Sequence, residues 1–353
     1  MTDIQNPRAF LPELTALRGV FALWVFAYHT NLHLHFAAFR GPIGCGYLGV
    51  DGFFILSGLV LGHRYPHLPW RAAGLARFWW RRFVRLYPTV LAMLAVLGAM
   101  YGVARLMGVH PHEALRASGR EFLLQIFLLN GLGFSQGWTW NYPSWSISTE
   151  WVGYLLFPVM AAVSARLPGR AVVLLLFGCA GLLFWLAGIG PSGLNLSYKG
   201  ALPRFLPEFL AGLLLARLLL LGCIPAVRVL IPLAIALFAA GIALRWRSSM
   251  GDALVVLALW LLLWGMAGAR RRSLTRIPGL FALGSLSYTF YMAYAPVEVL
   301  FARGTAHLGT APSTAPYPWL AVLFLADLAL AWLTTRFIER PALHHLAGRR
   351  ADG

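Results

Sequence analysis

The sequence predicts an all-α protein of the polytopic membrane class, a bundle of helices that crosses the bilayer many times. Hydrophobic residues make up 59% of its 353 residues and charged residues only 12%. A soluble domain, by comparison, carries about 25% charged residues. Apolar runs of membrane-spanning length also recur from residue 14 to residue 335. We therefore expect one integral-membrane domain over residues 1–353, with no attached soluble domain.

The apolar runs indicate about ten transmembrane helices. Their approximate ranges are 14–35, 47–63, 84–107, 146–165, 171–189, 205–221, 229–244, 253–268, 279–302 and 318–335. A further stretch, 122–133, is short and ends in glycines. We expect this stretch to lie at the membrane interface or to re-enter the membrane, not to cross it.

The distribution of basic residues favours one orientation of these helices. The chain has 29 Lys and Arg against 12 Asp and Glu, a net charge of +17. In a soluble protein this excess would suggest nucleic-acid binding, but in a membrane protein it is typical of basic cytoplasmic loops. If 122–133 does not cross, most basic residues fall on the cytoplasmic side, and if it crosses, most fall outside. We therefore predict ten crossings with both termini cytoplasmic, and no nucleic-acid partner.

Two ionisable residues, Arg18 and His29, stand eleven residues apart in the first apolar run. At about 100° per residue they return to the same helix face, separated by about 16 Å along the axis. Ionisable groups inside a membrane span are costly, and they usually face a functional interior. In the predicted orientation, His29 lies toward the outer side and Arg18 toward the cytoplasm.

His29 and Asp51 are expected at a similar depth near the outer ends of the first two spans. A carboxylate on one imidazole nitrogen fixes the tautomer, so that the other nitrogen can accept a proton from a hydroxyl group. We therefore predict that Asp51 orients His29 as a general base. The alternative is that His29 is an interfacial histidine that is hydrogen-bonded to a backbone carbonyl.

Arg82 and Arg85 stand three residues apart in the segment FWWRRFVRLYP, so they share one helix face at the cytoplasmic end of their span. Guanidinium groups bind phosphate bidentately, which would suit a phosphate-bearing ligand. The alternative is a basic flank that binds anionic lipid headgroups. A ligand site needs these particular arginines, whereas a flank needs only their charge.

Aromatic and hydroxyl side chains supply candidate substrate-binding residues. Trp145 and Glu150 lie in NYPSWSISTEW, where rings beside a carboxylate would suit a carbohydrate, although an aromatic belt would also explain the rings. Tyr288, Tyr291 and Tyr294 lie in LGSLSYTFYMAYAP and are candidates to line the bundle interior.

Other residues and motifs carry less chemistry. Ser57 is six residues from Asp51 and off its helix face, so we expect it to hydrogen-bond its own backbone. Asp327 lies within the last span, where it would pair with a neighbour. The sequence contains no phosphate-binding loop, dinucleotide fingerprint or zinc motif, and we expect no metal.

Seven segments, in this order along the chain, resemble the acyltransferase 3 family of integral-membrane acyltransferases. They read LTALRGVFALWVFAYH, GYLGVDGFFILSG, RRFVRLYP, YPSWSISTEWVGYLLFP, LPEFLAGLLLA, LGSLSYTFYMAYAP and FIERP. The more specific marks are the Arg-x10-His pair in the first span and Arg-x-x-Arg in the third. The chain departs from the family where members often carry a histidine near Tyr294, and where many begin Leu-Asp-Gly-Leu-Arg, because here Thr15 and Ala16 stand in that motif.

The resemblance implies a role for several residues. His29 matches the proposed general base and Arg18 its partner, while Asp51 matches the Gly-Val-Asp carboxylate. Arg82 and Arg85 match the arginines on the coenzyme A side, and Glu150 matches the acidic residue of the Ser-x-Glu region. The family implies an acyl-CoA donor at the cytoplasmic face, an acceptor hydroxyl on a sugar, and a bacterial cytoplasmic membrane as the location.

We therefore expect a membrane O-acyltransferase, most simply an O-acetyltransferase that uses acetyl-CoA. Its acceptor would be a cell-envelope polysaccharide or a glycosylated metabolite. The main alternative is a proton-coupled transporter that uses His29, Asp51 and Glu150 as a relay. A further alternative is a lipid-binding structural subunit, in which His29 has no chemical role.

Overall fold

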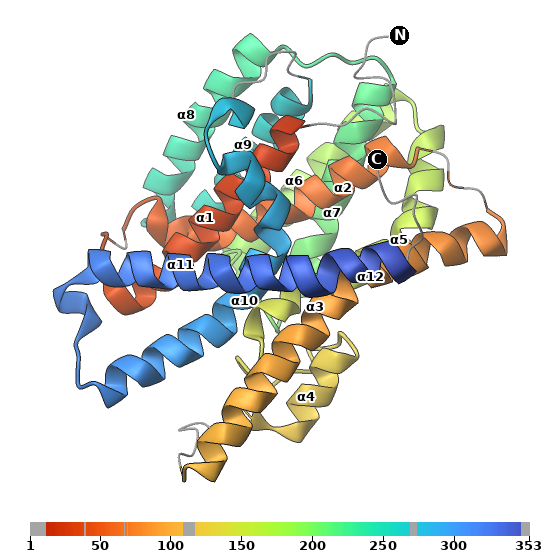
Figure 1. Cartoon of the computed structure of the whole chain (residues 1–353). Helices are drawn as coiled ribbons and strands as arrows, with labels where there is room; N and C mark the ends of the chain where they lie inside the picture. The colour runs from red at the N-terminus through yellow and green to blue at the C-terminus, as the bar shows by residue number, and fades with distance from the viewer. Residues whose placement is uncertain are drawn as a thin grey trace.

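The computed structural model describes residues 12–38, 40–66, 68, 70–108, 117–268 and 274–346. Within these residues the chain forms helices and connecting turns with no β-sheet, as the composition predicts (Figure 1). The α-helices are α1 (Pro12–Leu34), α2 (Gly49–Arg64), α3 (Ala72–Leu106), α4 (Gly119–Ile126), α5 (Trp145–Arg166), α6 (Gly169–Ile189), α7 (Ala201–Leu220), α8 (Val227–Arg245), α9 (Gly251–Ala267), α10 (Leu280–His307), α11 (Pro316–Thr334) and α12 (Arg340–Leu346).

Each of the ten predicted apolar runs overlaps one of these helices. Within the described part of the chain, six stretches of helix are long and apolar enough to cross a membrane on length and composition. The count of ten crossings therefore stays a prediction. So does the placement of both termini in the cytoplasm, and residues 1–11 and 347–353 lie outside the described residues.

The stretch 122–133 folds partly as the short helix α4 and partly as turns. The eight residues of α4 are about 12 Å long at 1.5 Å per residue. The hydrocarbon core of a bilayer is about 30 Å thick, so α4 by itself is too short to cross it.

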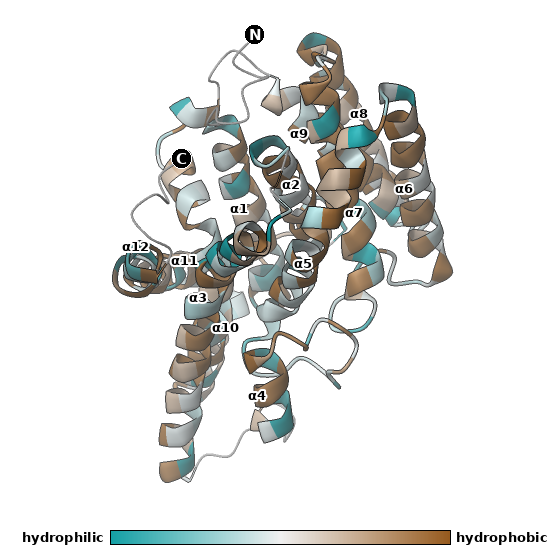
Figure 2. Ribbon diagram, turned by 90° about the vertical axis from the view of Figure 1, so that its right-hand side faces the viewer, coloured by the Kyte–Doolittle hydropathy of each residue, from teal (hydrophilic) through white to brown (hydrophobic). Residues whose placement is uncertain are grey.

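Two helices, α6 and α8, present apolar side chains outward. Both are apolar over a membrane-spanning length, and most of the residues in that length are not buried within the protein. Figure 2 shows both helices coloured predominantly as hydrophobic. A helix that is apolar on its outer face suits contact with lipid, because the hydrocarbon core offers no partner for polar side chains.

The centre of the bundle is formed by α1, α2 and α7, which contribute side chains to both clusters of buried hydrophobic residues. At the crossing of α2 and α7, a Cβ atom on Gly58 would collide with the Phe209 carbonyl oxygen, and one on Gly212 with the Ile55 carbonyl oxygen. The two glycines therefore let the backbones touch, as small residues do in membrane helix packing.

A similar close approach joins α1 to α10. A Cβ atom on Gly19 would overlap the Leu280 carbonyl oxygen, and one on Gly284 would overlap the Thr15 carbonyl oxygen. This contact lies one turn from Ser287, and it brings that hydroxyl group within hydrogen-bonding distance of Arg18.

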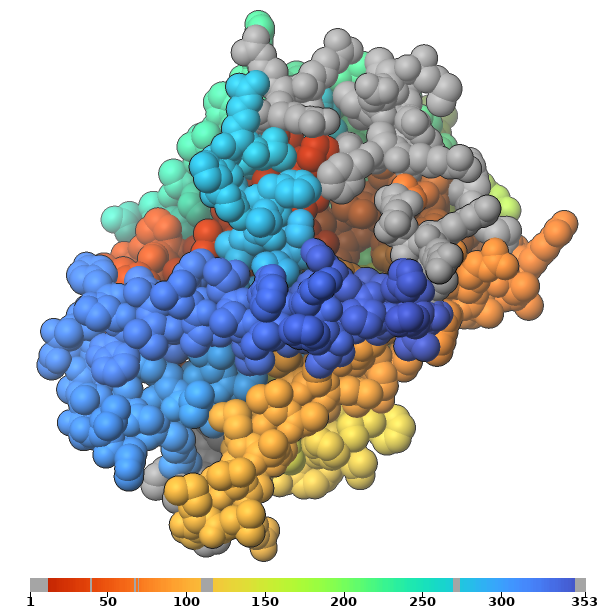
Figure 3. All heavy atoms as spheres, in the orientation of Figure 1, coloured from red at the N-terminus to blue at the C-terminus, as the bar shows by residue number. Residues whose placement is uncertain are grey.

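The last helices run on as one rod. The α11 helix passes through a π-helical turn, Thr335–Glu339, directly into α12. The rod crosses the front of the bundle in Figures 1 and 3. The turn places Glu339, whose side chain is 6% exposed, against Arg85 of α3.

Candidate active site

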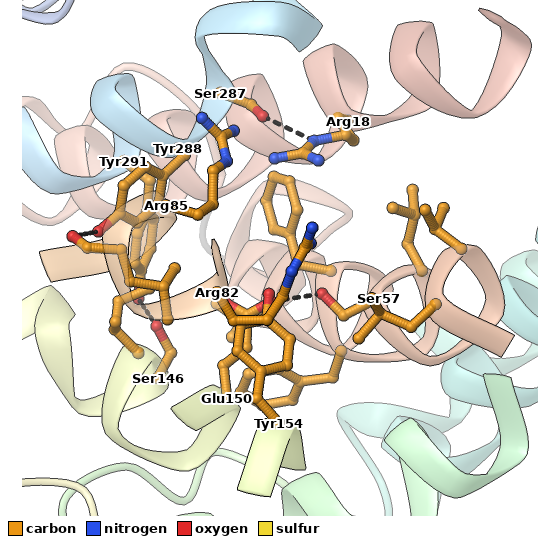
Figure 4. A pocket seen from close by; sticks show the side chains of 18 residues that line it. Arg18, Ser57, Arg82, Arg85, Ser146, Glu150, Tyr154, Ser287, Tyr288 and Tyr291 are labelled. Carbon is orange, nitrogen blue, oxygen red and sulfur yellow. Dashed lines mark hydrogen bonds between the residues drawn. The ribbon is translucent and has the colours of Figure 1, made fainter. Parts of the chain in front are cut away.

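The first cavity is lined by three arginines, and we call it the arginine cavity. Arg18 comes from α1, and Arg82 and Arg85 come from α3, with further side chains from α2, α5 and α10. The cavity has a volume of about 120 Å³. Figure 4 shows the three guanidinium groups turned toward the same space. The spacing of Arg82 and Arg85 therefore places both on the cavity face of α3, as predicted, whereas Arg81 does not line it.

Two of these arginines are held by neighbouring side chains. Arg18 donates a hydrogen bond from Nε to the Ser287 hydroxyl at 3.0 Å. Arg85 forms an ion pair with Glu339, and its guanidinium carbon lies 5.5 Å from the centre of the Tyr288 ring. Tyr288 in turn donates a hydrogen bond to the Leu86 carbonyl oxygen at 2.6 Å.

Arg82 is held by aromatic rings, and no carboxylate of the described residues pairs with it. Its guanidinium carbon lies 5.9 Å from the ring centres of both Tyr65 and Tyr154. Its buried Nε has no hydrogen-bond partner among the described residues. A guanidinium in this position keeps donor capacity for an anionic ligand.

Glu150 lines the same cavity, where two hydroxyl groups donate to it. Its Oε1 accepts hydrogen bonds of 2.6 Å from both Ser57 and Tyr154. The expectation that Ser57 hydrogen-bonds its own backbone is therefore wrong, because α5 packs a carboxylate against that face of α2. The carboxylate also offsets part of the positive charge of the arginines.

A second cavity, which we call the histidine cavity, is lined by His29 and has a volume of about 220 Å³. Its other lining residues are Tyr28, Leu32, His33, Tyr47, Val50, Trp138, Tyr142, Trp145, Asn195, Ser197, Arg204, Tyr291 and Glu298. Val50 and Tyr291 line both this cavity and the arginine cavity. The two spaces are therefore neighbours, and these two side chains form the boundary between them.

His29 lies among aromatic rings. Its ring centre is 5.1 Å from that of Tyr28, 5.7 Å from that of Tyr142 and 5.4 Å from that of Tyr294. Among the described residues, the imidazole makes no hydrogen bond. The interfacial alternative, in which a backbone carbonyl holds the ring, therefore finds no such contact in the described part of the chain.

The predicted contact between Asp51 and His29 is not formed. Both carboxylate oxygens of Asp51 accept hydrogen bonds from Arg204, one from Nε at 2.9 Å and the other from a terminal nitrogen. Asp51 is 0% and Arg204 1% exposed. A fully buried carboxylate requires a compensating charge, and the bidentate guanidinium supplies it. The guanidinium carbon of Arg204 also lies 5.6 Å from the centre of the Trp145 ring, and both residues line the histidine cavity.

The carboxylate that shares the histidine cavity with His29 is Glu298. Its Oε1 lies 2.6 Å from Nε2 of His33, and the Tyr142 hydroxyl is a second hydrogen-bonding neighbour of the carboxylate. Sequence reasoning gave no role to Arg204, Glu298 or Glu339. Each of the three is an ionisable residue within or beside an apolar run, and this feature could have marked it as a candidate site residue. The pairing of these residues, however, could not be read from their spacing.

The tyrosines and Trp145 divide between the cavities. Trp145 lines the histidine cavity, Tyr288 the arginine cavity, and Tyr291 both. The Tyr291 hydroxyl donates to the Pro143 carbonyl oxygen at 3.1 Å and accepts from Ser146 at 3.2 Å. Tyr294 lies behind the His29 ring in a smaller space. Within the described residues, no group of three or more His, Cys, Asp or Glu side chains is arranged to hold a metal ion.

The sequence profile of the acyltransferase 3 family, which describes an acyltransferase domain, matches residues 11–336. The match covers most of the chain and both cavities, so this protein belongs to the acyltransferase 3 family.

Among curated relatives, "Acyltransferase MdmB" of Streptomyces mycarofaciens is 31% identical over 178 residues, which are 45% of this chain and 41% of that protein. "Peptidoglycan O-acetyltransferase OatA" of Listeria monocytogenes is 30% identical over 169 residues, 44% of this chain and 25% of the relative. "O-acetyltransferase OatA" of Staphylococcus aureus is 26% identical over 197 residues, 50% of this chain and 29% of the relative. The matched segments thus span less than half of each relative. No solved structure shows a significant match.

Proposed function

We propose that the protein is a membrane O-acyltransferase, most simply an O-acetyltransferase, which transfers an acyl group from acyl-CoA to a hydroxyl group of a sugar-containing acceptor. The observation that best supports this proposal is the meeting of the two cavities at Val50 and Tyr291. One cavity is cationic and the other contains an imidazole, so an anionic donor and a neutral acceptor can enter separately and react where the spaces adjoin.

The donor would occupy the arginine cavity. Coenzyme A carries several phosphate groups, and guanidinium groups bind phosphate oxygens in a bidentate manner. Arg82 is the best-placed ligand because it makes no ion pair with a described carboxylate and its Nε is unpartnered. Arg18 and Arg85 would add positive charge nearby. In the predicted orientation this cavity opens toward the cytoplasm, where acyl-CoA is made.

The acceptor would occupy the histidine cavity. The rings of Trp138, Tyr142 and Trp145 line it, and aromatic rings pack against the C–H faces of sugars. Two of the relatives are named O-acetyltransferases, and one of these names specifies peptidoglycan, a sugar polymer. These names support a hydroxyl acceptor on a carbohydrate or on a glycosylated metabolite.

His29 would act as the general base. Its imidazole removes the proton of the acceptor hydroxyl while the hydroxyl oxygen attacks the thioester carbonyl carbon. The C–S bond breaks, the ester forms, and coenzyme A leaves as a thiolate that takes up the released proton. Asp51 would hold Arg204 in place, and Arg204 in turn supports the Trp145 ring that lines the cavity. Glu150 would offset part of the positive charge of Arg18.

The test replaces His29 with glutamine in purified full-length protein that is reconstituted into phospholipid vesicles. Labelled acetyl-CoA and a chito-oligosaccharide serve as probes, and release of free coenzyme A is measured. We expect His29→Gln to lower the rate about 10²- to 10⁴-fold, the usual contribution of a general base, with unchanged protein yield. His345→Gln, at an exposed position of α12, is the control.

Full coenzyme A release by the His29→Gln protein would reject the base assignment. A proton-coupled transporter would release no coenzyme A in either form, and a structural subunit would be indifferent to the substitution. The location in a bacterial cytoplasmic membrane is part of the same proposal, and the six apolar helical stretches and the family support it.

A further inference from the structure

A third, smaller space lies beside His29, and we call it the rear cavity. It has a volume of about 10 Å³ and is lined by Ala22, Val25, Phe26, His29, Pro143, Phe290, Tyr291, Tyr294 and Asp327. His29 and Tyr291 line both the rear cavity and the histidine cavity. His29 therefore borders both the proposed acceptor site and the space that contains Asp327.

Asp327 is the one charged residue of α11, and it has no described partner. Its side chain is 0% exposed, and neither carboxyl oxygen makes a hydrogen bond with the described residues. The Tyr294 hydroxyl, in the same cavity, is also buried, and the Thr30 side chain of α1 is its hydrogen-bonding neighbour. The expectation that Asp327 pairs with a neighbouring side chain is therefore not met in the described part of the chain. An unpartnered buried carboxyl group costs stability, so its presence calls for a ligand or a function.

The rear cavity has room for a single water molecule and polar groups to hold it. A bound water needs roughly 10–15 Å³ of cavity volume and two to four polar partners, and the volume of the rear cavity, about 10 Å³, is at the lower end of that range. The polar groups available are the Asp327 carboxyl oxygens, the Tyr294 hydroxyl and a ring nitrogen of His29, since all three residues line the cavity. The rest of the lining is almost entirely apolar, so these groups have few competing partners.

We propose that Asp327 is a positioning residue for His29 and acts through a water molecule that the Tyr294 hydroxyl helps to hold in the rear cavity. This inference rests on the proposed role of His29 as a base. The water links the carboxyl group to the ring nitrogen that faces the rear cavity, which fixes the tautomer. The other ring nitrogen is then free to accept the acceptor's proton. Carboxylates in hydrogen-bonded contact with a catalytic histidine act in this way on orientation and tautomer.

The other nearby carboxylates are less suited to this role. Both oxygens of Asp51 are taken by Arg204. Glu298 and its partner His33 line the histidine cavity, on the side where the acceptor would bind, and neither lines the rear cavity. Asp327 is therefore the acidic group placed to act on His29 without obstructing the acceptor.

The test is an NMR measurement of the imidazole nitrogens together with enzyme kinetics. The protein is labelled with ¹⁵N-histidine, and the His29 signals are identified by their loss in His29→Gln. Asp327→Asn preserves the side-chain volume but removes the carboxylate. We expect the His29 signals to shift from one tautomer toward a mixture of both. In vesicles with acetyl-CoA, we expect kcat to fall about tenfold or more while KM for acetyl-CoA stays within about twofold, as for the loss of an orienting contact.

Two further variants separate positioning from folding. Tyr294→Phe removes only the hydroxyl, and a smaller change in the same His29 signals is expected. Glu13→Gln alters another buried carboxylate of the bundle, which accepts hydrogen bonds from the Leu274 amide and the Thr275 hydroxyl. It should leave the His29 signals unchanged.

Unchanged His29 signals in both Asp327→Asn and Tyr294→Phe would overturn the positioning role. That result is independent of the base assignment, which fails only if His29→Gln retains coenzyme A release. A shift in the signals with no change in kcat would also overturn the proposal, because the tautomer would then have no effect on turnover.

Discussion

Asp51 and Arg204 face each other across the packing of α2 against α7 as a buried bidentate ion pair. The two residues lie near the N-terminal ends of their helices. Further along the same two helices, Gly58 and Gly212 let the backbones touch. Arg204 also donates to the carbonyl oxygens of Leu196 and Tyr47. This one guanidinium therefore ties α2 and α7 to two adjoining segments that form the wall of the histidine cavity.

Breaking the pair should destabilise the protein. Asp51→Asn removes the carboxylate that pairs with Arg204 and leaves the buried Glu208 as the neighbouring acidic group, so we expect the free energy of unfolding to fall by up to about 3–5 kcal/mol. Arg204→Lys keeps the charge but loses the planar fork, so its effect should be smaller than that of Asp51→Asn. Thermal unfolding in detergent micelles measures both. An Asp51→Asn protein with the wild-type unfolding temperature would contradict the structural role of the pair.

Replacing Arg82 with lysine should weaken donor binding even though the charge is kept. Lysine cannot reproduce a bidentate contact with phosphate or the stacking on Tyr65 and Tyr154. We expect the affinity for acetyl-CoA to fall about tenfold, which corresponds to the loss of about one charge-assisted hydrogen bond. Equilibrium binding of acetyl-CoA to the protein in vesicles measures this affinity.

The neighbouring Arg81 provides a matched control for Arg82, because it carries the same charge on the same helix but does not line the arginine cavity. Arg81→Lys should bind acetyl-CoA as the wild type does. Equal affinity for all three proteins would favour the lipid-flank alternative, in which only the charge of the segment matters.

Added bulk at the boundary of the cavities should separate donor binding from transfer. Val50→Phe places a larger side chain between the arginine cavity and the histidine cavity. We expect acetyl-CoA binding to stay within about threefold of the wild type, because the arginines are untouched, while turnover falls about 100-fold through misplacement of the reacting groups. Val103→Phe, at an outward-facing position of α3, controls for the added ring. Normal turnover in Val50→Phe would exclude transfer across this boundary.

Several features of the site were predictable because they depend only on helical periodicity and on the cost of charge in an apolar environment. Arg82 and Arg85 share a helix face through their spacing, and both line one cavity. Arg18 and His29 likewise line neighbouring cavities from a single helix. In each case the relevant geometry lies within one helix, so sequence spacing determines it.

The partners of these residues were not predictable in the same way. Asp51 was assigned to His29 because the two lie at similar depth, but depth is shared by every residue at that level of the bundle. The choice of Arg204 follows from the rotation and contact of α2 against α7. The same holds for Ser57 with Glu150, Arg85 with Glu339, and His33 with Glu298, all of which join different helices.

By itself, the sequence determined that this chain forms long apolar helices, and which of them carry ionisable residues at membrane depth, because composition and the 3.6-residue period act locally. Tertiary structure alone decided which charges neutralise one another and which remain available. Those pairings depend on the rotation and crossing of helices far apart in the chain. Tertiary packing also decides that two cavities meet at Val50 and Tyr291, and that Asp327 and His29 line the same rear cavity.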